Sequence, residues 1–476
     1  MAFPAHKTKL IGTIGPASDS PQILKAMILA GMNVARLNFS HGDFPSHKEA
    51  IDKIKAASLA TERRVAIMAD LPGPKIRIGQ IDDEPIELKP GDSFTLTTEE
   101  IIGDAARVSV SFSELPRTVK SGDKLYINDG YVQVEVNKID GNDVHCKVLT
   151  GGRLRSRKGL NLPGIDLGIS AFTDHDRACL KFAMENGVDA VSQSFVQTGQ
   201  DIEAVRQAAS ELGHDPFIIA KIERAGARRN LSDILQTADG IMIARGDLGV
   251  EIPIEQIAVA QKDIIRQANM MGKPVITATQ MLESMTTNRR PTRAEATDVA
   301  NAILDGTDSV MLSGESAMGL YPVDAVAMLA KIAAVIEPHR SLNPIGQTLR
   351  VQREEDKIKL ADLIAQSVET TLTRITPPTV IVPTRSGATA RSISRSKLPV
   401  WITAVSSQEQ TCQDLMFSYG VHPVHAPDHP ENWRLWAKNW LHTQGIRGDL
   451  VVLTEGPSTK HPARNNRMEI IDLRRE

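Results

Sequence analysis

Residues 217–223 read FIIAKIE and place a lysine and a glutamate at the end of an apolar run typical of a buried strand. Side chains alternate between the two faces of a strand, so Lys221 and Glu223 point to the same side. Removing a charge from water is costly unless the charge is paired or bound to an ion. The spacing therefore indicates a site where these two side chains meet a further charged group.

Polar side chains also follow the other apolar runs that the sequence predicts as strands. They are Arg36, Asn38, Ser40 and His41, then Asp70, then Arg245 to Asp247, Thr277 and Thr279, and lastly Ser313 and Glu315. In a barrel of parallel strands, such carboxyl ends meet at the face that carries active sites. For any single strand, polar residues at its end are explained better by contact with solvent than by an active site. Two carboxylates, a lysine and an arginine from several strands favour a shared site.

The residue types indicate phosphoryl chemistry. Glu223 and Asp247 offer hard oxygen ligands on neighbouring strands, which suit Mg²⁺ or Mn²⁺, and no His or Cys accompanies them to favour zinc. Lys221 and Arg36 are cations of the kind that bind phosphate. A metal and cations around a transferred phosphate are the recurring parts of phosphoryl transfer. The sequence lacks a GxxxxGK[ST] loop, which excludes a P-loop nucleotide site.

The elements that would position these residues form an alternation of β-branched runs and amphipathic helices. The strand candidates are residues 9–14, 33–39, 64–70, 189–195, 217–222, 240–245, 274–279 and 308–313. A helix over about 21–30 has Ser20 as a candidate N-cap, Pro21 at its first position and Gly31 after its end. Eight strands alternating with helices favour a closed (β/α)₈ barrel. An open doubly wound sheet is the alternative, because a strand count does not show closure.

Two parts of the chain break this alternation. Residues 72–167 show no convincing helix but contain runs such as YVQVEVNKI between turn signals such as KPGD and NDG. Residues 72–167 are therefore predicted to form a β domain inserted in a TIM barrel. The barrel itself is predicted to comprise residues 1–71 and 168–344. A helix over 356–374 and runs such as TVIVPT and DLVVLTEG predict a C-terminal α/β domain over 345–476. The predicted fold class is therefore α/β.

Composition excludes several classes of protein. The 476 residues carry 55 Lys plus Arg and 58 Asp plus Glu, a net charge of −3 that gives no reason to expect a nucleic-acid partner. The 3 cysteines form no CxxC pair, so neither a zinc knot nor a disulfide framework is expected. The start, MAFPAHKTKL, lacks the apolar core of a signal peptide, and no run approaches the roughly 20 apolar residues that cross a bilayer. We expect a cytoplasmic protein without a membrane partner.

Several long motifs make the chain similar to a known family. They are KLIGTIGPAS (9–18), GMNVARLNFSHG (31–42), IIAKIERA (218–225), MIARGDLGVEI (242–252), TATQMLESM (277–285) and DVANAILDGTDSVMLSGESA (298–317). With these motifs the sequence resembles the pyruvate kinase family over essentially all residues to about 455. The resemblance implies a (β/α)₈ barrel, an inserted β domain that acts as a lid, a C-terminal α/β regulatory domain and a homotetramer.

The resemblance also implies an activity and the residues that carry it. The activity is Mg²⁺-dependent transfer of a phosphoryl group from phosphoenolpyruvate to ADP, which gives pyruvate and ATP in the last step of glycolysis. The positions that match the family's catalytic residues are Lys221, Thr279 and Arg36, and the same three residues with Gly246 and Asp247 match its substrate contacts. Glu223 and Asp247 match the metal ligands. Asn38, His41, Arg77 and Lys158 match the nucleotide contacts. A second Mg²⁺ would arrive with ADP.

One departure from the family pattern concerns monovalent cations. The potassium-requiring branch continues its third strand as DTKGPEIR, whereas this chain reads DLPGPKIR, with Leu71 for Thr and Lys75 for Glu. A lysine there can place its ammonium where the monovalent cation would sit, held by groups such as Asn38, Ser40 and Asp70. We therefore expect that K⁺ is not required. The alternative is that Lys75 is a solvated residue of the inserted domain.

A second candidate site lies in the C-terminal domain, where PTRSGATAR (383–391) follows a predicted strand. Hydroxyls, a basic residue and glycine at the start of a helix can bind phosphate through N–H and O–H groups. The family uses the matching loop for sugar-phosphate effectors, which makes candidates of Thr384, Arg385, Ser386, Gly387 and Thr389. An ordinary strand-to-helix turn is the alternative. The segment TEGPSTKHPARNNR (454–467) matches the rest of the family's effector loop poorly, so the sequence does not name the effector.

Two rival functions remain open at this point. Lys221 could be the Schiff-base lysine of an aldolase barrel, although carboxylates committed to a metal and two phosphate-binding cations fit that chemistry poorly. The chain could also be an inactive relative that senses sugar phosphates through its C-terminal domain. Every metal and lysine position is filled, which favours an active enzyme.

Overall fold

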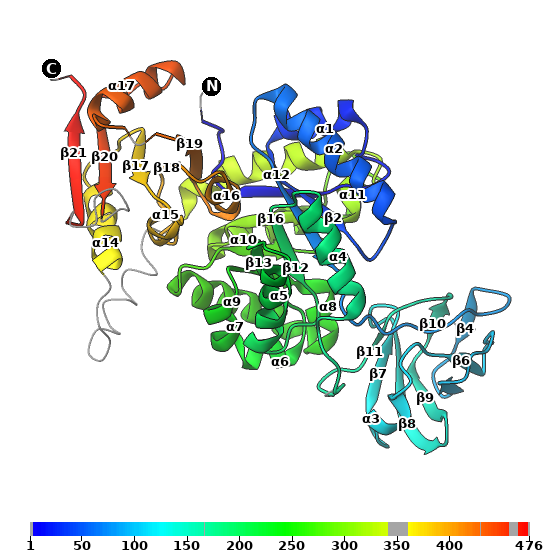
Figure 1. Cartoon of the computed structure of the whole chain (residues 1–476). Coiled ribbons are helices and arrows are strands. Elements are labelled where there is room, and N and C mark those ends of the chain that lie inside the picture. Colours follow the sequence, from blue (N-terminus) through cyan, green and yellow to red (C-terminus); the bar gives the residue numbers. More distant parts are fainter. Residues whose placement is uncertain (1–2, 166, 341–359, 429, 457–464, 475–476) are drawn as a thin grey trace.

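The computed structural model describes residues 3–165, 167–340, 360–428, 430–456 and 465–474. Eight parallel strands close a barrel in the order β1-β16-β15-β14-β13-β12-β3-β2 (Figure 1). Their bounds are β1 (Lys9–Thr13), β2 (Met32–Asn38), β3 (Ala66–Leu71), β12 (Ala190–Gln193), β13 (Phe217–Ile222), β14 (Gly240–Ala244), β15 (Val275–Ala278) and β16 (Ser309–Leu312). Closure confirms the predicted (β/α)₈ barrel and excludes the open doubly wound sheet.

Helices cover the outside of the barrel. They are α1 (Pro21–Ala30), α2 (Phe44–Thr61), α4 (Asp174–Glu185), α5 (Gly199–Glu211), α6 (Ala225–Arg229), α7 (Leu231–Thr237), α8 (Arg245–Glu251), α9 (Ile257–Met270), α10 (Arg293–Asp305), α11 (Gly314–Ala317) and α12 (Pro322–Ile336). The predicted caps of α1 are present: the Ser20 side chain accepts the Ile23 N–H, and Gly31 ends the helix at φ 122°. That φ is open to glycine and strained for other residues. Within the described residues, no helix has the length and apolar character that spanning a membrane requires.

The amino-terminal end of the barrel is closed by apolar side chains. Ile11, Val34 and Met68 from the strands pack in one buried cluster with Met416 and Phe417, which come from the C-terminal part of the chain. The ring of Phe417 stacks on that of Phe217 with centroids 5.3 Å apart. The polar residues that follow the strands lie at the opposite, carboxyl end, because all eight strands are parallel.

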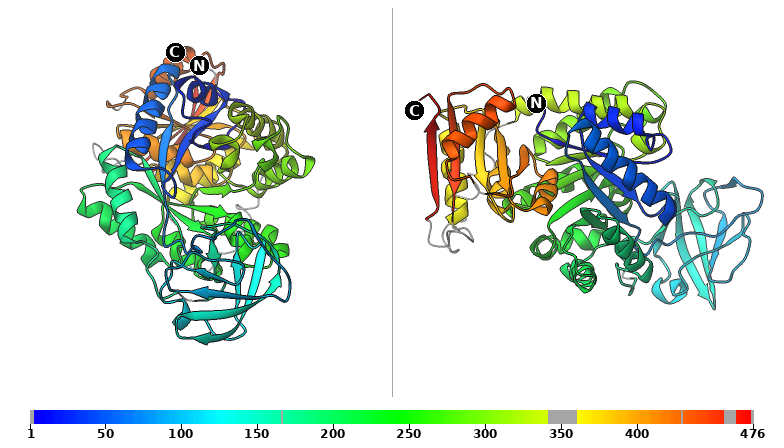
Figure 2. Two further views of the ribbon diagram at one scale, coloured as in Figure 1. Left: turned by 90° about the vertical axis from the view of Figure 1, so that its right-hand side faces the viewer. Right: turned by 45° about the horizontal axis from the view of Figure 1, so that its top comes forward.

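An all-β unit, called here the inserted unit, leaves the barrel after β3 and returns before α4. It contains β4 (Ile86–Leu88), β5 (Ser93–Thr97), β6 (Arg107–Ser109), α3 (Leu115–Thr118), β7 (Lys124–Ile127), β8 (Val132–Asp140), β9 (Asp143–Thr150), β10 (Gly152–Leu154) and β11 (Leu160–Asn161). Its buried residues, from Ile76 to Leu167, form a cluster of their own. The inserted unit and the C-terminal unit lie on opposite sides of the barrel (Figures 1 and 2).

The C-terminal unit is a five-stranded sheet with helices. The sheet runs β19-β18-β17-β20-β21, and β21 is antiparallel to β20. The bounds are α14 (Leu360–Leu372), β17 (Thr379–Pro383), α15 (Ala388–Ser394), β18 (Trp401–Ser406), α16 (Glu409–Asp414), β19 (Val421–His425), α17 (Trp433–Thr443), β20 (Leu450–Glu455) and β21 (Arg467–Asp472). The first residues of the helix predicted over 356–374 lie outside the described residues. The observed α/β architecture agrees with the prediction.

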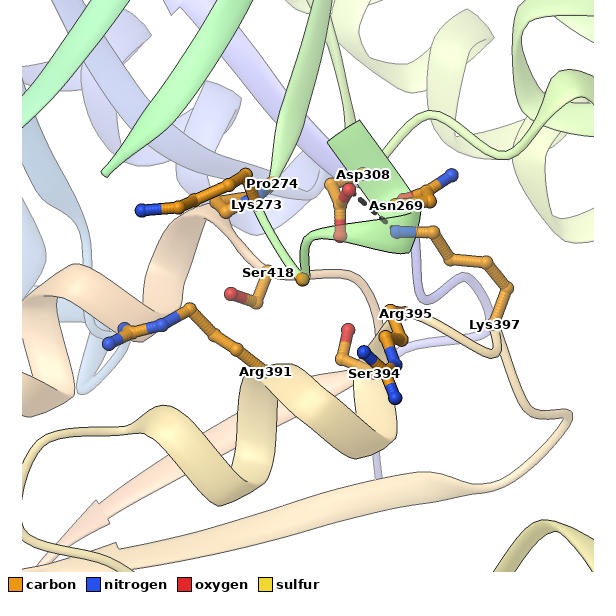
Figure 3. Close-up of a pocket in the computed structure, with 10 residues that line it drawn as sticks. Asn269, Lys273, Pro274, Asp308, Arg391, Ser394, Arg395, Lys397 and Ser418 are labelled. Atoms are coloured by element: carbon orange, nitrogen blue, oxygen red, sulfur yellow. Dashed lines mark ion pairs between the residues drawn. The ribbon is translucent and has the colours of Figure 1, made fainter. Parts of the chain in front are cut away.

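This unit contacts the amino-terminal end of the barrel through a buried ion pair. Lys397 Nζ lies 2.6 Å from Asp308 Oδ2, and both side chains line a small cavity between the units (Figure 3). The same carboxylate accepts the N–H groups of Val275 at 3.0 Å and Tyr419 at 2.9 Å. Asp308 therefore ties a barrel strand to the C-terminal unit with both of its oxygens in use.

Candidate active site

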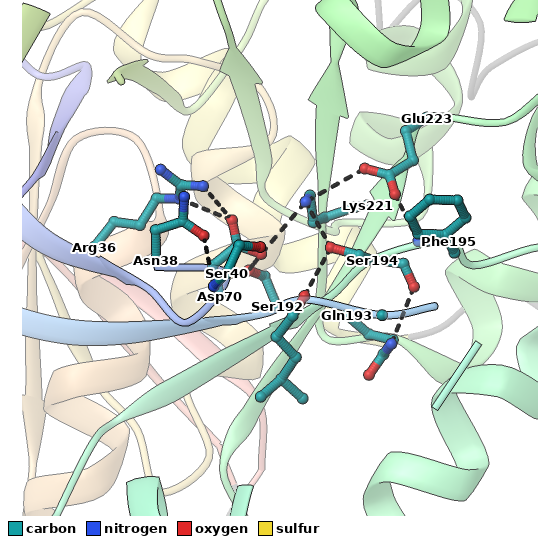
Figure 4. Close-up of polar contacts among 12 residues, drawn as sticks. Arg36, Asn38, Ser40, Asp70, Ser192, Gln193, Ser194, Phe195, Lys221 and Glu223 are labelled. Atoms are coloured by element: carbon teal, nitrogen blue, oxygen red, sulfur yellow. Dashed lines mark hydrogen bonds and ion pairs between the residues drawn. The ribbon is translucent and has the colours of Figure 1, made fainter. Parts of the chain in front are cut away.

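Asp70, near the end of β3, joins two cationic side chains at the carboxyl end of the barrel (Figure 4). Its Oδ2 accepts hydrogen bonds from Arg36 Nε at 2.8 Å and Nη2 at 2.5 Å. Its Oδ1 lies 3.4 Å from Lys221 Nζ and accepts the Ser192 hydroxyl at 2.9 Å. Burial alone would raise the pKa of Asp70, but Lys221 and Arg36 lower it to about 2. Asp70 is therefore an anion that fixes both cations.

Lys221, on β13, is surrounded by carboxylates. Its Nζ lies 3.3 Å from Glu223 Oε2 in addition to the contact with Asp70, and it donates a 2.7 Å hydrogen bond to Ser194. Burial alone would lower the pKa of Lys221, but Asp70, Glu223 and Asp247 outweigh burial and hold the pKa above its usual value. Lys221 therefore remains an ammonium at neutral pH. The predicted proximity of Lys221 and Glu223 is confirmed.

Glu223 keeps one oxygen available for a ligand. Oε1 accepts the Phe195 N–H at 2.6 Å, whereas the buried Oε2 accepts no hydrogen bond, although the Lys221 ammonium is within ion-pair distance. Burial raises the pKa of Glu223, and the neighbouring Asp247 carboxylate adds to the rise against the effect of Lys221. A bound cation would relieve both the burial cost and the repulsion between the carboxylates. The donor set therefore fits a divalent ion that prefers oxygen.

Within the described ranges, no cluster of three or more His, Cys, Asp or Glu side chains is placed to hold a metal ion. Two carboxylates, Glu223 and Asp247, lie close enough for the charge of Asp247 to raise the pKa of Glu223. An ion that binds both would leave positions for other oxygen ligands, as is usual for Mg²⁺, which keeps waters and substrate oxygens.

Asp247 and Thr279 come from two neighbouring strand ends. Asp247 lies in α8, which follows β14 directly, and the N–H of Gly246 in the same helix donates to Thr279 Oγ1 at 2.8 Å. Thr279 and the next residue, Gln280, have φ of 70° and 52°. Such left-handed conformations in non-glycine residues cost about 1–3 kcal/mol and occur at functional sites. The structure therefore brings Gly246 and Thr279 together, and Asp247, the residue after Gly246, lies within electrostatic range of Glu223.

The sequence matches two family models, and together they cover most of the chain. One, described as "Pyruvate kinase, barrel domain", matches residues 5–326, and the other, described as "Pyruvate kinase, alpha/beta domain", matches residues 362–471. The chain belongs to the pyruvate kinase family. It is therefore a phosphotransferase of that family.

Individual pyruvate kinases resemble this chain over nearly its full length. One from Thermococcus litoralis is 49% identical and the match covers 99% of this chain and 100% of the relative. One from Geobacillus stearothermophilus is 41% identical, with 98% of this chain and 80% of the relative covered. A crystal structure of a pyruvate kinase from Cryptosporidium parvum superposes with a TM-score of 0.90 at 38% identity and covers 98% of this chain and 96% of that one.

Two of the residues predicted to contact a nucleotide, Arg77 and Lys158, lie in the inserted unit. The Ile78 N–H donates to the carbonyl of Lys158 at 2.9 Å, and Arg77 Nη1 donates to the carbonyl of Arg157 at 2.9 Å. These bonds place Arg77 and Lys158 on adjacent segments. Burial lowers the pKa of His41, and Lys75 and Arg77 add to the effect. Several positive charges therefore gather beside the active site.

Lys75 lies within electrostatic range of Lys221, Asp247 and Glu223. Burial lowers the pKa of Lys75 most and the Lys221 ammonium lowers it further, while Asp247 and Glu223 act in the opposite direction. Among the described side chains, no hydrogen bond or ion pair joins Lys75 to the predicted pocket residues, which are Asn38, Ser40 and Asp70. Asp70 is instead bonded to Arg36. The structure thus brings Lys75 into the charged site without the contacts that the sequence suggested.

The predicted effector residues form one turn between β17 and α15, and they are Thr384, Arg385, Ser386, Gly387 and Thr389. The Thr384 hydroxyl accepts the N–H of Gly387, at 2.9 Å, and Gly387 has φ 77°. Arg391 Nη2 donates to the carbonyl of Ser386 at 2.6 Å. The turn is therefore held by its own hydrogen bonds, and the structure brings the five predicted residues together.

The end of β12 contributes three contacts to the site, and none of its residues was among the predicted site residues. Ser192 binds Asp70, Ser194 binds Lys221, and the Phe195 N–H binds Glu223. The run VSQSF places Ser192 and Ser194 on one face by the same alternation that linked Lys221 with Glu223. Small hydroxyls give a weaker sequence signal than charges, although here they complete the site.

Proposed function

We infer that this chain catalyses Mg²⁺-dependent transfer of a phosphoryl group from phosphoenolpyruvate to ADP, which gives pyruvate and ATP as the last step of glycolysis. The observation that carries the proposal is the cluster in which Asp70 fixes Arg36 and Lys221 beside Glu223, whose Oε2 accepts no hydrogen bond. Fixed cations next to a free carboxylate oxygen suit a transferred phosphoryl group and its metal.

Each charged residue has a proposed role. Arg36 and Lys221 bind the phosphate of phosphoenolpyruvate, because Asp70 holds both cations in place. Since the carboxylates keep Lys221 protonated, it stabilises the charge of the phosphoryl group in flight and of the enolate that remains, and does not transfer a proton. The same protonation argues against the Schiff-base rival, which requires a neutral amine.

The remaining substrate contacts come from the strands next to Lys221. We assign Gly246, Asp247 and Thr279 to the carboxylate of the substrate, and Thr279 to the face where the enolate is protonated. Binding of a carboxylate would replace the Thr279 hydroxyl as acceptor of the Gly246 N–H. Glu223 and Asp247 would hold Mg²⁺ or Mn²⁺, which neutralises charge that develops on substrate oxygens when bound.

The nucleotide is proposed to bind on the side of the inserted unit. Asn38, His41, Arg77 and Lys158 are the proposed contacts, and the positive charge gathered there suits a polyphosphate. Lys75 is proposed to replace a monovalent cation, so that K⁺ is not needed, because its positive charge interacts with the Asp247 and Glu223 carboxylates.

Several wider features are proposed from family membership. The division into a barrel (1–71 and 168–344), a lid (72–167) and a regulatory domain (345–476) is supported by separate buried cores. A cytoplasmic homotetramer activated by a sugar phosphate at the turn 384–389 completes the proposal. Titration of hexose and pentose phosphates at low phosphoenolpyruvate tests the effector, and flat responses to all of them would refute it.

A coupled assay for ATP formed from phosphoenolpyruvate and ADP tests the main proposal. We expect activity that needs a divalent cation and is lost with a chelator. A protein that binds sugar phosphates but forms no ATP would instead support the inactive sensor. Trapping of a carbonyl substrate with borohydride, insensitive to chelator, would support the aldolase rival.

A further inference from the structure

Ser194 connects the proposed catalytic lysine to the strand that leads into the inserted unit. Its Oγ accepts the 2.7 Å hydrogen bond from Lys221 Nζ and donates one of 2.7 Å to the carbonyl of Leu71. A hydroxyl carries one proton and two lone pairs, so both bonds can exist at once. Leu71 is the last residue of β3, and the chain enters the inserted unit immediately after it. Ser194 is 3% exposed, so water does not compete for these bonds.

The outgoing connection also passes directly against Ser194. Gly73 has φ 64°, and a Cβ built on it would lie 3.0 Å from Ser194 Cβ and 3.1 Å from a ring carbon of Phe195. The Gly73 N–H donates to Asp176 Oδ1 at 2.9 Å, which fixes the other side of the connection. Displacement of this segment would therefore press on, or withdraw from, the residues that follow β12.

The returning connection reaches the same place through a buried amide. Gln193 Nε2 donates to the carbonyl of Ala171 at 2.7 Å and to that of Ser194 at 3.0 Å. Ala171 lies on the segment that runs back from the inserted unit to α4. Gln193 is fully buried, and its Oε1 has no hydrogen-bond partner. The Gln193 amide therefore links the return segment, through Ala171, to the backbone of Ser194.

The next residue carries the connection to the proposed metal ligand. The Phe195 N–H donates to Glu223 Oε1 at 2.6 Å, and Phe195 adopts φ 61°. This left-handed conformation is unfavourable for an aromatic residue and persists where the surroundings impose it. Residues 194 and 195 therefore touch Lys221 and Glu223 on one side and both connections of the inserted unit on the other (Figure 4).

We propose that Ser194 is a positioning residue that couples both connections of the inserted unit to the Lys221 ammonium. The inference rests on the proposed function, because the group that Ser194 positions is the lysine assigned to phosphoryl transfer. When the inserted unit shifts, Leu71 and Ala171 move the acceptor of Lys221, so the placement of the ammonium depends on the position of the inserted unit.

The first test replaces Ser194 with alanine. In Ser194→Ala, kcat falls about ten- to a hundredfold, because a misplaced charge loses part of its effect on the transition state. KM for both substrates stays within about threefold, because the hydroxyl bonds Lys221 and the Leu71 carbonyl and acts only through the lysine. The matched control is Val191→Ala, a buried substitution in the same strand that lowers Tm but leaves kcat unchanged. A Ser194→Ala protein with lowered Tm and wild-type kcat overturns the proposal.

The second test asks whether the return connection acts through Ser194. Gln193→Leu removes the hold on Ala171 and lowers kcat by a few-fold with KM unchanged, roughly as expected for a supporting residue. If both residues belong to one connection, the double variant has the kcat of Ser194→Ala alone. Independent, multiplicative losses overturn the coupling. If Ser194→Ala does not fold, Gln193→Leu decides alone, and wild-type kcat in that variant overturns the proposal.

Different results would contradict the proposed function and the coupling through Ser194. A wild-type protein that forms no ATP from phosphoenolpyruvate and ADP overturns the proposed function and this inference together. An active wild type whose Ser194→Ala variant is equally active overturns the coupling alone.

Discussion

Two buried lysine–aspartate pairs lie at opposite ends of the barrel, and they behave differently. Lys221 and Asp70 are 3.4 Å apart at the carboxyl end, and Lys397 and Asp308 are 2.6 Å apart at the amino end. Burial alone would lower the pKa of both lysines. For Lys397 burial prevails and the pKa falls to about 8, although Asp308 raises it, and Arg340 adds to the lowering. Additional carboxylates raise the pKa of Lys221 above its usual value.

The carboxylates at the two ends also differ in how many of their oxygens accept hydrogen bonds. Both oxygens of Asp308 are satisfied by Lys397 and by the N–H groups of Val275 and Tyr419. At the other end, Glu223 Oε2 is buried without a hydrogen bond. A saturated pair serves as a contact between units. Carboxylates in excess, one of them with an oxygen that accepts no hydrogen bond, suit the binding of a cation.

The largest expected effect comes from removing the lysine at the carboxyl end. Lys221→Ala should lower kcat about a hundred- to a thousandfold, because it removes a fixed charge that acts in the transition state. Steady-state kinetics measure the loss, and circular dichroism checks that the protein stays folded. Near-normal turnover in a folded variant would refute the assignment.

Removing the other lysine should separate stability from activity. Lys397→Met leaves the Asp308 charge buried without its partner, which costs about 3 kcal/mol of free energy of unfolding. Because the site lies at the opposite end of the barrel, kcat of the folded variant stays near the wild-type value. Urea unfolding and steady-state kinetics on the same samples measure both. A kcat as low as that of Lys221→Ala would remove the distinction between the two ends.

The two lysines should also give opposite pH dependences of stability. The pKa of Lys397 falls from 10.5 to about 8 on folding, so between these values the unfolded chain binds more protons at this group and stability rises with pH. Below about pH 8 both states are protonated and the slope disappears. Lys221, whose pKa is raised, stabilises the fold below its ordinary pKa of 10.5 and loses that contribution above its folded pKa.

Thermal unfolding of the wild type and of Lys397→Met from pH 7 to pH 10 measures the Lys397 contribution. We expect the difference in Tm between the two proteins to stay constant up to about pH 8 and to change in favour of the wild type above it. A difference that stays constant across the whole range would show that the pKa of Lys397 is not lowered.

The smallest expected effect concerns monovalent cations. When tetramethylammonium replaces K⁺ at constant ionic strength, charge screening is unchanged and only the identity of the cation differs, so we expect the initial rate to change by less than about twofold. The physical reason is that the Lys75 ammonium, whose charge interacts with Asp247 and Glu223, can take the place of the monovalent cation. A large drop in rate would show that the site needs K⁺ after all.

The sequence predicted the barrel well because its signals are local. Each barrel strand lies within or close to its predicted run, and Ser20 and Gly31 end α1 as their cap preferences indicate. The strand β19, with the sequence VHPVH, was not predicted. Proline is rare in strands and is tolerated at an edge, and the sheet order places β19 at its edge. Pairing with β18 thus overrides a weak local preference.

The candidate site was predictable where charge made it visible. Lys221 and Glu223 stand out in an apolar run, but the bonds of Asp70 to Arg36 and Lys221 depend on barrel closure, which places β2, β3 and β13 around one end. That Glu223 Oε2 accepts no hydrogen bond likewise depends on packing, because only the fold shows which N–H groups are near it.

Anomalous diffraction from crystals grown with Mn²⁺ and phosphoenolpyruvate tests the central claim most directly. We predict a strong manganese peak bound by Glu223 Oε2 and the Asp247 carboxylate, with the phosphate on the Lys221 and Arg36 side. A manganese peak elsewhere, or none between these two carboxylates, would contradict the account.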